Sequence, residues 1–152
     1  MKVGVIGAGT MGAGIAQAFA VTDGYEVVLC DIKQEFADGG KAKIEKNLSK
    51  QVAKGRMEQA KADAVLAKIT TSGDNAAVAD CDLVVEAAIE RMDLKQQLFQ
   101  QLDKIVKPEA ILASNKMCIR DSWISVRRFY VRKIIGTICA RTGFIPMKKG
   151  MR

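Results

Sequence analysis

The sequence contains no histidine, only two prolines, and aromatic side chains at just 5% of its 152 residues. The commonest metal ligand, which is also the usual acid–base group near neutral pH, is therefore absent. No apolar run approaches the roughly 20 residues that a transmembrane helix requires. Glycine interrupts the first residues too early for a secretory signal. We therefore expect a cytoplasmic protein without a membrane partner.

Cysteine is also sparse. The four cysteines, Cys30, Cys81, Cys118 and Cys139, are widely spaced and form no C-x-x-C pair. This spacing, with no histidine beside it, predicts no zinc site and no other metal centre. Free cysteine is among the most frequently buried residue types, so we expect reduced and mostly buried thiols.

Charge is distributed unevenly along the chain. Residues 1–115 carry 14 basic and 16 acidic side chains, whereas residues 116–152 carry 10 basic side chains and a single acidic one, Asp121. The net charge is therefore −2 in the first part and +9 in the second. Such asymmetry can mark a segment that binds nucleic acid.

The first 115 residues alternate short apolar runs with amphipathic stretches of helical period. This alternation predicts a doubly wound α/β domain of the Rossmann type, with a parallel sheet covered by helices on both faces. Gly39 and Gly40 interrupt the start of the second helical stretch. Strands are expected near residues 2–6, 26–31, 69–71, 83–88 and 110–113, and helices near 11–21, 34–53, 57–67, 75–79 and 92–106.

A G-x-G-x-x-G motif follows the first expected strand and opens the first helix. Gly7 permits a tight turn, Gly9 lets a pyrophosphate approach the backbone, and Gly12 lets the helix pack close to the strand. Asp31 ends the second strand, where it would accept hydrogen bonds from ribose hydroxyls and repel a 2′-phosphate, which favours NAD over NADP. The expected cofactor contacts in this region are Gly7, Gly9, Thr10, Met11, Gly12 and Asp31.

The alternative interpretation of the same residues, without a ligand, is a glycine-rich turn that binds nothing, followed by a solvated acid at a strand end. The strand before the motif, the helix after it and the acid 19 residues beyond Gly12 together favour the NAD interpretation.

Three blocks of sequence resemble the 3-hydroxyacyl-CoA dehydrogenase family, especially its short bacterial 3-hydroxybutyryl-CoA members. The blocks are residues 5–20, with Asp31-Ile32-Lys33 after them, residues 82–92, and residues 107–115. The resemblance implies hydride transfer between a 3-hydroxyacyl-CoA and NAD, in fatty-acid or butanoate metabolism. It also implies that Glu90 and Lys95 contact the nicotinamide side of the cofactor.

The resemblance further implies that Lys50 and Lys54 contact coenzyme A from the long second helix. Lysine is a suitable point-charge partner for the phosphates of that substrate. From spacing alone, both lysines would be assigned to a solvated helix face.

After Asn115 the resemblance stops. The family's substrate-orienting serine falls at Met117, which has no hydroxyl, and the family's catalytic histidine has no counterpart. The helical C-terminal domain, through which the family forms homo-oligomers, has no counterpart either. We therefore expect no catalytic residue in this chain, and a truncated domain that binds NAD without turnover.

Residues 116–152 are expected to be a separate, unrelated basic tail. Lys116–Ser122 resembles the translation of an adapter used in DNA library preparation, so we interpret the tail as chimeric or out of frame. A DNA read that crosses this junction without adapter sequence would contradict that hypothesis. The alternative is a natural extension that binds single-stranded nucleic acid through its mixture of cations and aromatics, but no recognisable module supports it.

Two further alternatives concern the domain itself. One is a Rossmann dehydrogenase acting on another hydroxy acid, and the other is a regulatory domain that senses NAD without chemistry. The family resemblance favours the acyl-CoA interpretation over both.

Overall fold

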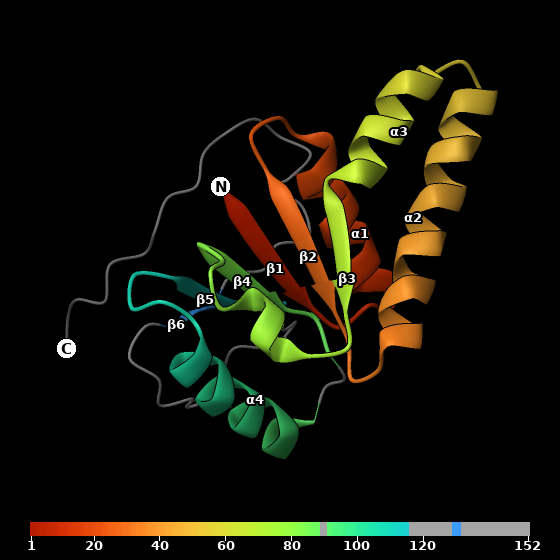
Figure 1. Cartoon of the computed structure of the whole chain (residues 1–152). Coiled ribbons are helices and arrows are strands. Elements are labelled where there is room, and N and C mark those ends of the chain that lie inside the picture. The colour runs from red at the N-terminus through yellow and green to blue at the C-terminus, as the bar shows by residue number, and fades with distance from the viewer. Residues whose placement is uncertain (89–90, 116–128, 132–152) are drawn as a thin grey trace.

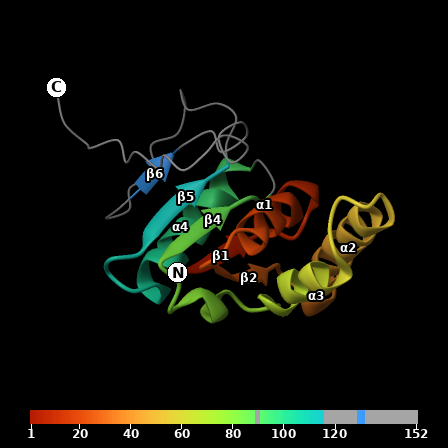
Figure 2. The same ribbon diagram turned by 90° about the horizontal axis from the view of Figure 1, so that it is seen from above.

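The computed structural model describes residues 1–88, 91–115 and 129–131, and shows a parallel sheet whose strand order is β3-β2-β1-β4-β5-β6. Figure 2 shows β2, β1, β4, β5 and β6 side by side in this order. The order reverses between β1 and β4, which confirms the expected doubly wound Rossmann fold. The strands are β1 (Lys2–Ile6), β2 (Glu26–Cys30), β3 (Ile69–Ser72), β4 (Leu83–Glu86), β5 (Ile111–Ser114) and β6 (Phe129–Val131).

Helices cover both faces of this sheet, as Figure 1 shows. Three of them pack on one face, while α4 and a short 3₁₀ helix, η1, pack on the other. The α2 and α3 helices form a hairpin that extends beyond the sheet. The helices are α1 (Thr10–Val21), α2 (Gln34–Ala53), α3 (Gln59–Ala67), η1 (Asn75–Val78) and α4 (Met92–Ile105).

Alternation along each strand divides the core into two apolar clusters. In β2, Val27 and Leu29 pack beneath α1, α2 and α3, whereas Val28 and Cys30 face the side of η1 and α4. A parallel sheet buried on both faces requires apolar strands, and β1, β2, β4 and β5 are largely apolar runs of that kind, whereas β3 has the sequence Ile-Thr-Thr-Ser.

Apart from shifts of one or two residues at other element ends, three details differ from the sequence-based expectation. The α2 helix runs without interruption through its glycines. A Cβ on Gly40 would lie only 2.7 Å from the Cβ of Ala8. Gly40 therefore allows close packing and does not break the helix. The β4 strand ends at Glu86, two residues early. A sixth strand, β6, pairs with β5 within the expected tail, while the predicted domain boundary after residue 115 stays a prediction.

Cys30 and Cys81 are free, buried thiols, as expected. Burial raises the pKa of Cys30 to about 12 and that of Cys81 to about 11. Because the thiolate is the reactive form, neither should react in the folded chain at pH 8. We expect a Cys118→Ser/Cys139→Ser variant to be labelled by a disulfide reagent only after denaturant is added. Rapid labelling of this variant in native buffer would contradict the assigned burial.

The carboxylate of Asp82 forms contacts at the amino ends of the strands. Its carboxylate accepts a hydrogen bond from the Lys2 backbone N–H at 2.8 Å and pairs with Lys107. The hydrogen bond from Lys107, followed by that of the Lys2 backbone, lowers the pKa of Asp82 below its usual value. A carboxyl with a lowered folded-state pKa stabilises the fold above its unfolded pKa of about 3.9 and loses this effect as pH falls through the folded pKa.

We therefore expect Asp82→Asn to lower the urea midpoint at pH 7, and the loss to shrink below pH 4. The matched control is Asp23→Asn, because the Asp23 side chain is fully exposed and its substitution should change the midpoint little. A loss that is equal at every pH would show that packing, and not charge, accounts for the effect.

Candidate cofactor site

The glycine motif forms the turn between β1 and α1 at the carboxyl edge of the sheet. Gly7 has a φ of 101°, a conformation that residues with a side chain rarely adopt. Its N–H donates to the Cys30 carbonyl at 2.8 Å, and a Cβ at this position would lie 2.8 Å from the Ala87 carbonyl oxygen. The expected tight turn at Gly7 is confirmed, and it brings the ends of β1, β2 and β4 together.

Gly12 and Gly9 have different surroundings. A Cβ on Gly12 would lie 1.6 Å from the Gly7 carbonyl oxygen, which confirms that Gly12 allows α1 to approach the strand. A Cβ on Gly9 would have no atom within 4 Å. Gly9 is the N-cap of α1 and supplies no side-chain hydrogen bond to the helix. Thr10 and Met11 are exposed in the first turn beside it.

This open helix N-terminus fits a pyrophosphate. The first turn of a helix has N–H groups without intrahelical partners and carries a partial positive charge. The space at Gly9 lets a bulky anion come close to those groups. The contacts of Gly9, Thr10 and Met11 with a cofactor stay a prediction.

Asp31 lies directly after β2 and beside the glycine turn. One carboxylate oxygen accepts a hydrogen bond from the Ala8 N–H at 2.6 Å, and the other accepts from the Ile32 N–H at 2.8 Å. These bonds fix the carboxylate at the edge of the loop that would hold the phosphates. An oxygen has two lone-pair sites, so Asp31 can also accept from a ribose hydroxyl.

A buried polar cluster lies at the ends of β4 and β5, and the sequence alone did not predict that its members meet. The carboxylate of Glu86 accepts from the Ser114 hydroxyl at 2.6 Å and pairs with the Lys95 ammonium at 3.1 Å. The available signal was an acid within the otherwise apolar run of β4. Among the residues expected to reach the nicotinamide side, Lys95 therefore lies at the carboxyl edge, whereas Glu90 lies outside the described residues, as does Met117.

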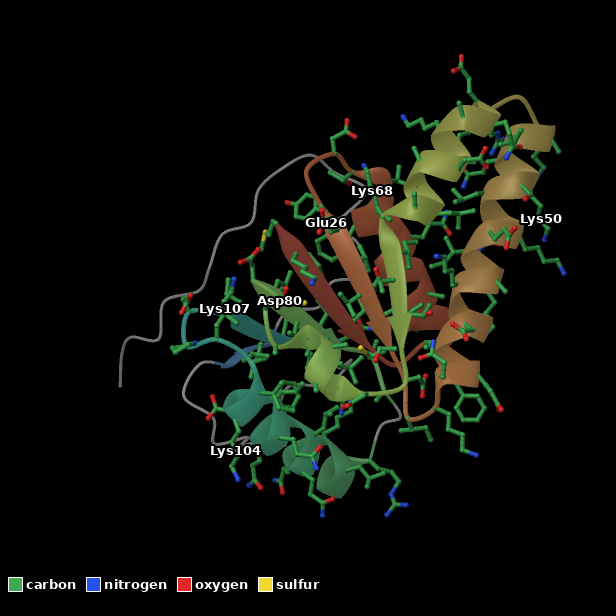
Figure 3. The ribbon with its side chains drawn as sticks, viewed as in Figure 1. Glu26, Lys50, Lys68, Asp80, Lys104 and Lys107 are labelled. Carbon is green, nitrogen blue, oxygen red and sulfur yellow. The ribbon has the colours of Figure 1, made fainter. Side chains whose placement is uncertain are left out.

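Lys50 and Lys54 lie far from the glycine turn. Lys50 is in the last turn of α2, about 24 Å along the helix axis from Gln34. Figure 3 shows its side chain extending away from the sheet. Lys54 is the C-cap of the same helix, and both lysines are exposed. Their position is compatible with a solvated helix face and with an extended ligand, and their role stays a prediction.

The strand order, the glycine turn and the acid after β2 define a dinucleotide-binding domain. Among the described residues, no group of three or more histidine, cysteine, aspartate or glutamate side chains could hold a metal ion. Within the same part of the chain, every helix is too short or too polar to cross a membrane.

Sequence comparison identifies the family. The profile of the 3-hydroxyacyl-CoA dehydrogenase NAD-binding domain matches residues 2–136. The chain therefore belongs to the 3-hydroxyacyl-CoA dehydrogenase family, as its NAD-binding domain, and NAD is the cofactor that the family indicates. The other hydroxy-acid dehydrogenase and the regulatory NAD sensor are not favoured.

Individual relatives agree with this assignment. A probable 3-hydroxybutyryl-CoA dehydrogenase of Deinococcus radiodurans is 54% identical over 119 residues, which cover 78% of this chain and 42% of the relative. A peroxisomal fatty acid beta-oxidation multifunctional protein of Arabidopsis thaliana is 37% identical over 135 residues, which cover 89% of this chain and 18% of the relative. The chain thus spans less than half the length of both relatives.

Structural comparison gives the same result. The crystal structure of (S)-3-hydroxybutyryl-CoA dehydrogenase from Ralstonia eutropha superimposes with a TM-score of 0.74 at 40% identity. The match covers 78% of this chain and 41% of that protein.

Proposed function

We propose that this chain binds NAD across the crevice between the ends of β1 and β4, and that its intact parent interconverts a 3-hydroxyacyl-CoA and a 3-ketoacyl-CoA. The glycine turn carries the proposal, because it leaves open space at Gly9 in front of the α1 N-terminus. The chemistry that bound NAD would supply is acceptance of a hydride from a substrate carbon that bears a hydroxyl. The substrate class is proposed from the names of the relatives.

In this proposal, different residues of the chain contact the two halves of the cofactor. Asp31 accepts hydrogen bonds from the adenosine ribose, the first turn of α1 binds the pyrophosphate, and Lys95 with Glu90 contacts the nicotinamide side. Lys50 and Lys54 contact the phosphates of coenzyme A from α2. We further propose a cytoplasmic protein whose intact parent forms a homo-oligomer through its C-terminal domain.

Binding and turnover are separable in this chain. A proton must leave the substrate hydroxyl during oxidation, and a histidine is the usual group that takes it. The sequence has no histidine, and Met117 stands at the position of the family's serine. We therefore propose that the chain itself binds NAD and does not turn over.

The test is a calorimetric titration of the full chain with NADH, followed by an assay with acetoacetyl-CoA and NADH. The proposal predicts saturable NADH binding and no oxidation of NADH above background. Absence of binding would overturn the proposed site. Turnover above background would show that residues other than the family's serine and histidine can supply the catalysis.

A further inference from the structure

Three polar side chains are buried among the described residues, and all three belong to one cluster. Glu86 is 0% exposed, Ser114 2% and Lys95 3%. They come from the end of β4, the end of β5 and the first turn of α4. The remaining buried side chains in the described part of the chain are apolar. The fold therefore concentrates its buried polarity at the carboxyl edge of the sheet.

The carboxylate of Glu86 organises this cluster. One oxygen accepts from the Ser114 hydroxyl at 2.6 Å and pairs with Lys95 at 3.1 Å. The other accepts from the Ala88 backbone N–H at 2.7 Å. Both oxygens are thus held in place, and the carboxylate in turn fixes the position of the Lys95 ammonium.

The position of Lys95 is energetically unfavourable for a charged side chain. Burial of an ammonium ion is unfavourable, and an apolar residue of similar volume often stabilises a core better than a buried ion pair does. Lys95 is also in the first turn of α4, where the partial positive charge of the helix N-terminus repels a cation. Packing alone therefore does not account for a lysine at this position.

The cluster lies close to the crevice in which the cofactor is proposed to bind. Glu86 is in register with Ile6, the residue before Gly7, on one side and with Ser114 on the other. In this strand order, a dinucleotide lies across the switch point, with one half above β1 and β2 and the other beyond β4. The cluster therefore lies on the β4 side, opposite Asp31.

We propose that Glu86 is a positioning residue, which holds the Lys95 ammonium at the nicotinamide half of the cofactor. This inference rests on the proposed NAD site. Glu86 is fully buried and does not touch the cofactor itself, so it acts through Lys95. An ammonium carries three N–H donors, and a lysine oriented by one carboxylate oxygen can direct another donor to a ligand.

The experiment compares NADH with 5′-AMP, which lacks the nicotinamide half, in calorimetric titrations of the full chain. Glu86→Gln and Lys95→Met should each raise the Kd for NADH about tenfold, the value of one charged hydrogen bond. Both variants should bind 5′-AMP with a Kd within about twofold of that of the unsubstituted chain. Lys95→Met and Glu86→Gln each leave one buried charge without its ion partner, so both should lower the Tm. The double variant Glu86→Gln/Lys95→Met removes both charges and tests the inference even if a single variant folds poorly. The matched control is Glu26→Gln, an exposed acid at the opposite edge of the sheet.

A double-substitution cycle tests whether Glu86 acts through Lys95. Adding Glu86→Gln to Lys95→Met should weaken NADH binding no further. An equal loss for NADH and 5′-AMP, unchanged NADH binding in the Lys95→Met chain, or a full additional loss in the double variant would overturn the inference. If the unsubstituted chain binds neither ligand, the proposed NAD site fails, and the positioning role fails with it.

Discussion

Replacing Gly12 with alanine should nearly abolish NADH binding and lower the Tm by roughly 10 °C. The new Cβ would lie 1.6 Å from the Gly7 carbonyl oxygen, which is part of the backbone and cannot rotate away. The α1 helix must therefore move off β1, and its N-terminal N–H groups move with it. Calorimetry and thermal unfolding measure the two effects.

Gly14→Ala is the matched control for this substitution. Gly14 is in the same helix, and a Cβ there would have no atom within 4 Å. Alanine is favoured over glycine in a helix by about 1 kcal/mol, so this variant should be equally or more stable and should bind NADH within about twofold of the original. Equal losses in both variants would show that any added methyl group disturbs α1, and would contradict the close approach at Gly12.

The second large effect concerns the choice between NAD and NADP. Asp31→Asn keeps an oxygen for the Ala8 N–H and removes the negative charge that repels a 2′-phosphate. The preference for NADH over NADPH, measured as a ratio of Kd values, should fall at least about tenfold. Asparagine has a single oxygen, so the hydrogen bond from the Ile32 N–H is lost and the Tm should fall slightly, while the fold is retained.

Glu35→Gln is the control for Asp31, because Glu35 is exposed in the first turn of α2, close in sequence to Asp31. Its substitution removes one charge from the same region and should leave the ratio unchanged. An unchanged ratio in Asp31→Asn would contradict the assignment of this carboxylate to the adenosine ribose.

The sequence predicted the glycine turn well, because its requirements are local. Gly7 needs a positive φ and Gly12 needs space against its own turn, and both needs are visible in one strand–turn–helix segment. The parallel sheet was equally accessible, since uniformly apolar runs separated by helices have few other arrangements.

The features that were missed depend on contacts between distant elements. Glu86, Lys95 and Ser114 form one cluster only once β4, α4 and β5 are packed together. An interruption at Gly39 and Gly40 was expected near the start of the second helix, since the contact of Gly40 with Ala8 joins segments about 30 residues apart and cannot be read from local sequence. Sequence period identifies which face of an element is buried but not which neighbour it meets there.

A titration of the ¹⁵N-labelled chain with NAD tests whether NAD binds at the turn between β1 and α1. Binding at this turn should produce saturable shifts of the backbone amide signals from Gly7 to Gly12 and of Ile32, with little change at Lys50 on the distal end of α2. Saturable shifts confined to regions away from the glycine turn, or no shifts at millimolar NAD, would contradict it.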